Sequence, residues 1–415
     1  MRYTALQHLV PRPGEFAAAP PESPRSWSMP AGPLTSLLGL TDIDAIVRAG
    51  LPADKAHVVQ EGRVVDPARY AWDRRADSTG FAGQVRAPAL ARLLDEGATL
   101  VVQSLQHNHR PVGEFCARLE HETGQTVFAE AFLTPGLRPG LEAHHDEEDV
   151  FIVQTAGSKT WSLHEPVLRR PLQHETYQRL ALDASARRRI AEAPPDLEVT
   201  LRPGDVLWIP RGWLHRGQAT DTASLHVTIG FPVLTRYWLA QRIAERLSVR
   251  DPASRPLREE LPWNAAKDAV RLAGLARDVA REVRDAVGAL DPAELARDLA
   301  DLALGGRREP DATASVTAGL RAREVGPETS VRLVPEAVRA TTPVPGRGVR
   351  VRLRDRSAVV PEPVGSWLHR RWEAGDETPV TAARLVPGLT SAAAVDAVRH
   401  LVRLGVLRPL DRTAP

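Results

Sequence analysis

Cysteine is nearly absent from this chain, since Cys116 is the only one among 415 residues. A single cysteine cannot form an intramolecular disulfide, which excludes a disulfide-stabilised secreted domain and fits a reducing compartment. No stretch approaches the roughly eighteen apolar residues of a membrane span. Residues 1–34 are rich in proline and alanine but lack a continuous apolar core, so no signal peptide is predicted. We therefore expect a cytoplasmic protein without a membrane anchor.

An excess of one charge is also lacking, since 54 basic residues against 52 acidic ones leave a net charge of +2. This balance excludes a general polyanion-binding character for the whole chain. Lysine is rare: Lys55, Lys159 and Lys267 are the three lysines, so 54 − 3 leaves 51 arginines. The length is too great for one hydrophobic core and predicts two or three domains.

Two motifs far apart in the sequence carry residues that bind metals. The first is His144-His-Asp146. Side chains alternate along a strand, so His144 and Asp146 would point to the same side if this segment were extended. Taken alone, a His-X-Asp also occurs by chance, as a surface turn or a hydrogen-bonded pair.

The second motif runs from Gly204 to His215 with the sequence Gly-Asp-Val-Leu-Trp-Ile-Pro-Arg-Gly-Trp-Leu-His. Its glycines and proline predict a turn, an apolar strand over Val206–Ile209 and a second turn. This arrangement would direct His215 into the cavity that His144 and Asp146 face. Two imidazoles and one carboxylate on one face of an octahedron leave three positions open, which suits Fe(II).

The spacing of the second motif resembles the second signature of the cupin superfamily. The segment from Gly140 to Leu163 combines the ligand motif with Asp149-Val-Phe and Gln154-X-X-Gly-X-Lys159-X-Trp. It resembles the JmjC-type ribosomal oxygenases, also called the cupin-4 family. The resemblance implies a 2-oxoglutarate- and Fe(II)-dependent protein hydroxylase in which His144, Asp146 and His215 are the metal ligands and catalytic residues.

The resemblance also implies that Lys159 binds the distal carboxylate of 2-oxoglutarate. A buried cation costs several kcal/mol unless it is paired. The alternative partner for Lys159 is one of the nearby acids Glu147, Glu148 or Asp149. Thr228, on a strand predicted over Leu225–Phe231, could donate a hydrogen bond to the co-substrate or only pack as a β-branched residue.

In the implied reaction 2-oxoglutarate chelates Fe(II) through its keto and adjacent carboxylate oxygens. Its oxidative decarboxylation by dioxygen gives succinate and carbon dioxide and leaves a hydroxyl group on the substrate. The cofactor supplies the difficult chemistry, and the protein supplies orientation and a dry cavity. Glu130 and Phe132 stand where the family typically has Asn and Tyr. These two departures indicate altered contacts to the co-substrate or the substrate.

The predicted fold class is α+β: a double-stranded β-helix of the cupin or JmjC jelly-roll type, then a helical dimerisation region and a C-terminal winged-helix domain. Many short strands separated by turns favour a closed or double-layered antiparallel structure. The expected strands are Thr99–Leu105, Val127–Thr134, Asp149–Gln154, Thr160–Leu163, Leu197–Leu201, Val206–Ile209 and Leu225–Phe231. Helices are expected at Val112–Thr123 and, as an insertion, at Tyr177–Ala193.

The expected domains follow shifts in composition along the chain. Residues 1–34 are expected to be loosely ordered, 35–235 to form the β domain, and 236–305 to be helical. Residues 306–345 are expected to form a linker and 346–415 a winged-helix-like domain. The apolar stripes over 236–305 need a partner surface, and the resemblance implies a homodimer. The alternative is that these helices pack on the same chain.

The C-terminal segment carries a local excess of positive charge. From Arg347 to Arg412 we count twelve arginines and seven acids, and 12 − 7 gives +5. Such a patch can bind phosphates, but the resemblance does not make nucleic acid the primary partner.

Three functions are therefore kept open. The first is hydroxylation of a protein substrate, for which a ribosomal protein is one candidate. The second is the same chemistry on a small molecule or modified peptide. The third is a ligand-sensing regulator that binds DNA.

Overall fold

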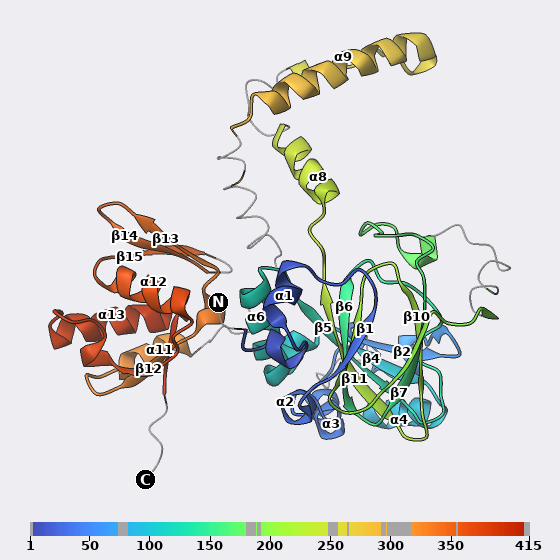
Figure 1. Ribbon diagram of the computed structural model, residues 1–415, viewed down its shortest axis with the longest axis horizontal. Coiled ribbons are helices and arrows are strands. Elements are labelled where there is room, and N and C mark those ends of the chain that lie inside the picture. Colours follow the sequence, from blue (N-terminus) through green and yellow to red (C-terminus); the bar gives the residue numbers. More distant parts are fainter. Residues whose placement is uncertain are drawn as a thin grey trace. The chain divides into compact units, whose positions relative to one another are not determined.

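A computed structural model describes residues 3–73, 82–179, 192–247, 256–263, 265–291, 317–353 and 356–410, together with Arg188 and Ala296. The fold is α+β (Figure 1). The chain divides into two compact units, one of Met1–Val233 with Pro310–Pro415 and the other of Leu234–Glu309. Within the described ranges, no helix has the length and apolar character needed to cross a lipid bilayer.

Two antiparallel sheets form the β domain. The larger sheet has the order β1-β9-β6-β11-β5-β4-β2-β3 and the smaller one the order β10-β7-β8. The larger sheet comprises β1 (Arg25–Ser28), β2 (Ala56–Gln60), β3 (Arg63–Val64), β4 (Thr99–Val102), β5 (Phe128–Thr134), β6 (Asp149–Ala156), β9 (Asp205–Ile209) and β11 (Ser224–Phe231). The smaller one comprises β7 (Lys159–His164), β8 (Leu197–Leu201) and β10 (Leu214–Ala219). This is the jelly-roll arrangement of sheets that the pattern of short strands predicted.

Strand β6 shows why both faces of the larger sheet are buried. Its alternate residues Phe151 and Val153 belong to the core on the helical side. Val150 and Ile152 belong to a second core, which includes Trp161 of the smaller sheet. Because neighbouring side chains on a strand point in opposite directions, the run from Val150 to Val153 is apolar without alternation. The second core therefore lies between the two sheets.

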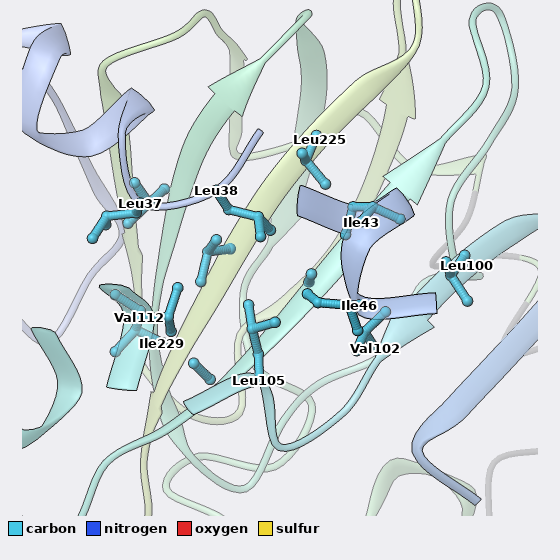
Figure 2. Packing of buried hydrophobic residues seen from close by; sticks show 14 of the residues in the cluster. Leu37, Leu38, Ile43, Ile46, Leu100, Val102, Leu105, Val112, Leu225 and Ile229 are labelled. Carbon is cyan, nitrogen blue, oxygen red and sulfur yellow. The ribbon is translucent and has the colours of Figure 1, made fainter. Parts of the chain in front are cut away.

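Helices cover the outer face of the larger sheet. They are α2 (Ala31–Thr35), α3 (Leu40–Arg48), α4 (Ala87–Asp95), α5 (Leu105–Asn108) and α6 (Arg110–Thr123). Ile43 and Ile46 of α3 are buried in the same cluster as Leu100 and Leu225 of the sheet (Figure 2). Isoleucines three residues apart lie on one helical face, so α3 contributes one apolar side to this core.

The expectation of a loosely ordered N-terminus was wrong. The segment forms η1 (Leu6–His8), α1 (Pro13–Ala18) and β1, and β1 pairs with β9. Leu6 and Leu9 are fully buried. The Glu122 carboxylate of α6 accepts hydrogen bonds from the backbone N–H groups of Ala5 at 2.8 Å and Leu6 at 2.9 Å. A few buried leucines and one carboxylate thus fix a segment whose average composition resembles that of a linker.

The unit Leu234–Glu309 is helical where it is described, as expected. It contains α8 (Arg236–Leu247), η6 (Pro256–Arg258), η7 (Ala265–Lys267) and α9 (Ala269–Gly288). Asp268 caps α9 by accepting hydrogen bonds from the backbone N–H groups of Val270 and Arg271, both at 3.0 Å. Residues 292–295 lie outside the described residues, as does most of the helix expected at Tyr177–Ala193, where η4 (Tyr177–Arg179) is described.

The C-terminal domain begins earlier than residue 346, because much of the expected linker 306–345 belongs to its core. Val331 and Leu333 are buried in the same cluster as Leu368 and Leu401. The domain contains α11 (Ala318–Glu324), β12 (Ser330–Leu333), η8 (Pro335–Ala337), β13 (Ala340–Val344), β14 (Gly348–Arg352), β15 (Ser357–Val360), α12 (Val364–Ala374), β16 (Val380–Thr381), η9 (Ala382–Arg384), α13 (Ser391–Arg403) and β17 (Leu407–Pro409). Its two sheets have the orders β16-β12-β17 and β13-β14-β15.

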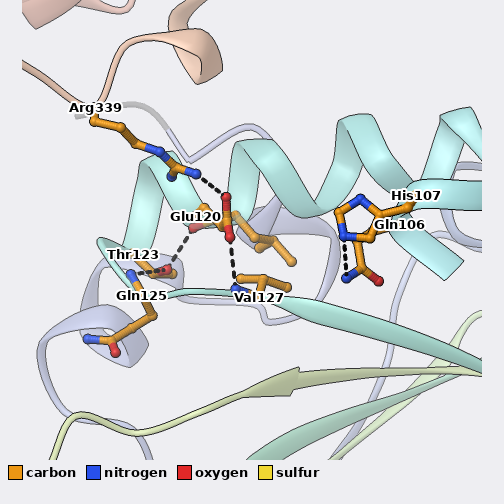
Figure 3. A network of polar contacts seen from close by, with 8 residues as sticks. Gln106, His107, Glu120, Thr123, Gln125, Val127 and Arg339 are labelled. Atoms are coloured by element: carbon orange, nitrogen blue, oxygen red, sulfur yellow. Dashed lines mark hydrogen bonds and ion pairs between the residues drawn. The ribbon is translucent and has the colours of Figure 1, made fainter. Parts of the chain in front are cut away.

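A buried ion pair joins α6 to this C-terminal domain (Figure 3). The Glu120 carboxylate accepts a hydrogen bond from the backbone N–H of Val127 at 3.1 Å. Its other oxygen pairs with the guanidinium of Arg339. The two side chains are 3% and 10% exposed, so either charge would be costly to leave without the other.

Candidate functional site

The two predicted motifs meet in one cluster of potential metal ligands. One ligand atom from each of His144, Asp146 and His215 lies within 4.8 Å of the others. Nε2 of His144 lies 3.6 Å from Oδ1 of Asp146, and Nε2 of His215 lies 3.6 Å from Oδ2. His144 occupies an isolated β-bridge opposite His215, and Asp146 follows in the segment before β6. The first motif is thus extended around His144 but does not lie on a regular strand.

Both imidazoles are oriented by backbone carbonyl groups. Nδ1 of His144 donates to the carbonyl oxygen of Glu142 at 2.7 Å, and Nδ1 of His215 donates to that of Trp213 at 3.0 Å. A proton on Nδ1 leaves a lone pair on Nε2 of the neutral ring, which is the arrangement that metal-ligating histidines use. Burial lowers the pKa of His215 to about 4, with the neighbouring His144 acting in the same direction. His215 is therefore neutral and able to ligate at neutral pH.

The turn that precedes His215 is bonded to the first motif. The Asp149 carboxylate accepts a hydrogen bond from the backbone N–H of Arg211 at 2.9 Å, and the Asp146 carbonyl accepts one from Gly212 at 3.0 Å. Gly212 has a φ of +88°, which favours glycine. A Cβ there would also approach the carbonyl oxygen of Leu168 to 2.6 Å. Gly212 is therefore required both by its backbone conformation and by the lack of space for a side chain.

All five predicted site residues line one cavity of about 310 Å³ between the two sheets. Glu130 and Phe132, the two residues at which the chain departs from the family pattern, line the same cavity. The lining comprises Phe128, Glu130, Phe132, Leu141, His144, Asp146, Glu148, Val150, Ile152, Lys159, Trp161, His215, Arg216, Gly217, His226 and Thr228.

Lys159 lies at the start of β7 and is 2% exposed. Its Nζ donates a hydrogen bond to Thr134 Oγ1 at 3.1 Å and lies 5.2 Å from the ring centroid of Trp161. In the described part of the chain this lysine forms no ion pair, so the alternative of pairing with a nearby acid is not supported. Burial lowers its pKa to about 7. An anion in the cavity would stabilise the charged form.

Two glycines make room for Lys159. A Cβ on Gly217 would lie 2.6 Å from Cε of Lys159, and one on Gly140 would lie 2.9 Å from its Nζ. Real Cβ atoms essentially never approach so closely. A larger residue at either position would displace the ammonium group, so the local sequence is matched to this lysine position.

Strand register places Thr228 directly opposite Glu130. Both side chains line the cavity. Burial raises the pKa of Glu130 to about 7, the negative charge of Asp146 adds to the rise, and a hydrogen bond with Gln103 opposes it. Glu130 thus adds an acid beside the ligand cluster, at a position where the resemblance implies a neutral amide.

His226 and Trp161 also line the cavity. His226 stands two residues before Thr228 on β11, so period-two alternation alone could have placed it on the same face. Of the other tryptophans in the motifs, Trp208 belongs to the core on the helical side, and Trp213 packs against the core between the sheets.

The candidate ligands lie in a part of the chain that is similar to a known domain family. The JmjC domain family matches residues 103–238. Human ribosomal oxygenase 1 is 30% identical over 195 residues, which are 46% of this chain and 28% of the human protein. Bovine ribosomal oxygenase 2 is 38% identical over 114 residues, 27% of this chain and 22% of that protein. The chain therefore spans less than a third of the length of these relatives.

Solved structures show the same fold over almost the entire chain. Escherichia coli YcfD superposes with a TM-score of 0.56 at 16% identity and covers 97% of this chain and 99% of its own. The same protein, described as a ribosomal oxygenase, has been solved with cobalt and 2-oxoglutarate, with a TM-score of 0.53 at 15% identity and coverage of 97% and 99%.

The chain contains a JmjC domain over residues 103–238, and the clustered His-X-Asp and His residues lie inside it. The sequence matches relate this part of the chain to the ribosomal oxygenases.

Proposed function

We propose that this protein is a 2-oxoglutarate- and Fe(II)-dependent dioxygenase that hydroxylates an amino-acid side chain of a protein substrate. One observation carries the proposal: three metal-binding side chains and a buried lysine without an ion-pair partner in the described residues share one cavity. The three metal-binding side chains suit a metal with open coordination positions, and the buried lysine suits an anionic ligand.

His144, Asp146 and His215 hold the metal in this proposal. The donor set fits Fe(II), because two neutral imidazoles and a carboxylate are the ligands of non-haem iron oxygenases. The bound iron and co-substrate supply the oxidation of an unreactive C–H bond, with succinate and carbon dioxide as by-products. The backbone carbonyls of Glu142 and Trp213 keep both rings turned toward the metal position.

Lys159 binds the distal carboxylate of 2-oxoglutarate in this proposal, and Thr228 contributes a hydroxyl on the same cavity wall. Thr134 holds the ammonium group through its hydroxyl. Burial strengthens the attraction between this ammonium and a carboxylate, because less water screens the charges. The aromatic residues Phe132 and Trp161 line the same cavity.

A polypeptide substrate is favoured by a second, larger cavity next to the first. It has a volume of about 900 Å³ and shares Leu141, Arg216 and Gly217 with the cavity that holds the candidate ligands. Space of this size beside the site suits a chain segment that inserts one side chain toward the metal. The names of the human and E. coli relatives make a ribosomal protein our first candidate substrate.

We also propose that the unit Leu234–Glu309 is a helical dimerisation region and that the protein is a homodimer. Large apolar side chains are exposed on this unit, among them Val270 at 82% and Trp263 at 99%. Burial of such residues against a second copy would remove them from water. Light scattering at micromolar concentration should give twice the chain mass, and a monomer would contradict this part.

The C-terminal domain is proposed to be winged-helix-like. Its three helices α11, α12 and α13 and the sheet β16-β12-β17 contribute to one core, and Thr390 caps α13 by accepting a hydrogen bond from Ala393. We do not assign nucleic acid as its primary partner.

The enzymatic proposal is tested by succinate formation. The full chain, Fe(II), 2-oxoglutarate and ascorbate are incubated with ribosomal proteins, and both succinate and a one-oxygen increase in protein mass are measured. Asp146→Ala should abolish both signals. Succinate with no protein mass change would favour a small-molecule substrate, and absence of both with wild-type protein would contradict the proposal.

A further inference from the structure

His226 is a buried polar residue of the cavity wall that the proposed chemistry does not use. It lies on β11, two residues before Thr228, and is 1% exposed. Within the described residues its Nδ1 has no hydrogen-bond partner. Leaving a buried nitrogen without a hydrogen bond is destabilising, and a buried polar group without a partner in the protein points to a ligand.

Aromatic contacts hold the His226 ring in place. It stacks on Phe132 with ring centroids 4.9 Å apart and planes at 5°, and it meets Trp161 edge-on at 5.3 Å and 79°. Phe132 is also its cross-strand neighbour on β5. These two aromatic contacts orient the imidazole, and its Nδ1 stays available.

The surroundings of His226 indicate the kind of ligand. Burial, the charge of Lys159 and the proximity of His215 all lower its pKa well below the ordinary value. A neutral imidazole carries one N–H donor. Trp161, whose Nε1 is also buried without a partner among the described residues, packs beside both His226 and Lys159. A cation and unsatisfied N–H groups lining one cavity fit an anion with several acceptor atoms.

We propose that His226 binds the co-substrate directly, by donating an N–H hydrogen bond to a carboxylate oxygen of the dicarboxylate that Lys159 holds. The inference rests on the proposed function and adds a specificity-determining residue to it. The neutral imidazole orients the carboxylate through a directional hydrogen bond, whereas Lys159 attracts it by its positive charge. A monocarboxylate held by Lys159 alone would satisfy fewer of the buried nitrogens, so the pair selects for a ligand with more acceptor atoms.

The test is a titration of 2-oxoglutarate into the full chain loaded with Mn(II). His226→Phe keeps the stack on Phe132 and removes the N–H. Its dissociation constant for 2-oxoglutarate should rise about tenfold, the loss expected for one hydrogen bond to a charged group. Mn(II) affinity should be unchanged. His226→Gln, which retains an N–H donor, should recover most of the affinity.

Two controls separate this inference from the proposed function. Wild-type protein must bind 2-oxoglutarate and Lys159→Met must lose it, because otherwise the proposed function itself fails. If wild type binds 2-oxoglutarate, Lys159→Met does not, and His226→Phe binds it as tightly as wild type, the His226 assignment is overturned.

A further pair of variants covers the case in which His226→Phe lacks a cooperative thermal transition. His226→Asn and His226→Ala both shorten the side chain, but only Asn retains an N–H group. Tighter 2-oxoglutarate binding by the Asn variant supports the proposal, and equal binding by the two overturns it.

Discussion

Lys159→Met should stabilise the ligand-free protein while it removes co-substrate binding. Burial lowers the pKa of Lys159 from 10.5 to about 7. Each pKa unit corresponds to about 1.4 kcal/mol, so keeping this ammonium charged costs the folded state up to roughly 5 kcal/mol. Methionine has a similar length and no charge. Because the site can relax around the lysine, we expect a gain of about 1–3 kcal/mol in the free energy of unfolding.

The pH dependence of this gain follows from the direction of the shift. Between the folded-state pKa of about 7 and the ordinary value of 10.5, the unfolded chain binds more protons at this lysine than the folded one. The free energy of unfolding of the wild-type protein should therefore rise with pH across that window, while the penalty is complete below it. The advantage of Lys159→Met should be largest below pH 7 and shrink as the pH approaches 10.

Denaturant unfolding with and without Mn(II) and 2-oxoglutarate measures both effects. At a hundred times its dissociation constant, a ligand stabilises the wild type by about 2.7 kcal/mol, and the variant should gain nothing from 2-oxoglutarate. Lys267→Met, at an exposed lysine, is the matched control and should change neither quantity. A Lys159→Met protein that is less stable than wild type below pH 7 and is still stabilised by 2-oxoglutarate would refute the reasoning.

Three further changes probe the cavity and the domain contact. Gly217→Ala should displace Lys159 and weaken 2-oxoglutarate binding by about tenfold or more, while Mn(II) binding stays intact. Calorimetric titration measures both affinities, and unchanged affinity for 2-oxoglutarate would contradict this prediction. Asp146→Ala should abolish Mn(II) binding, measured by electron paramagnetic resonance, and a retained tight site would place the metal elsewhere. Arg339→Ala removes the guanidinium that pairs with the buried Glu120 carboxylate and should lower the free energy of unfolding by about 3 kcal/mol; a loss below about 1 kcal/mol would mean that the pair contributes little.

Several strands of the β domain were predictable because apolar residues recur along them. The expected strand Leu197–Leu201 coincides with β8, and the expected Leu225–Phe231 differs from β11 by one residue. Strand β10 was missed because Arg216, Gly217 and Gln218 interrupt the apolar pattern. Its place is fixed by pairing with β7 and by the bridge between His144 and His215, which are contacts across long sequence separations.

Composition misled at both ends of the chain. The N-terminal segment was expected to be loose because prolines and alanines dominate its average, although Leu6 and Leu9 are enough to bury it. The segment 306–345 was expected to be a linker for a similar reason, yet Val331 and Leu333 alternate as core residues of β12. A few buried side chains are enough to order a segment, and the average composition of that segment does not reveal them.

Within the site, spacing alone was enough to suggest the cluster of His144, Asp146 and His215, and the resemblance to a known family implied Lys159. The importance of His226 could not be derived in the same way. Its stacking on Phe132 arises only when β11 and β5 pair in one register, and its unsatisfied nitrogen depends on the burial of the assembled cavity.

The most direct measurement is the visible absorption spectrum of the anaerobic protein with Fe(II) and 2-oxoglutarate. Chelation of the co-substrate at an iron held by His144, Asp146 and His215 should give a weak charge-transfer band. The band should be lost in His215→Ala, and adding excess 2-oxoglutarate should not restore it. Absence of the band from folded wild-type protein, or its persistence in His215→Ala, would contradict the account.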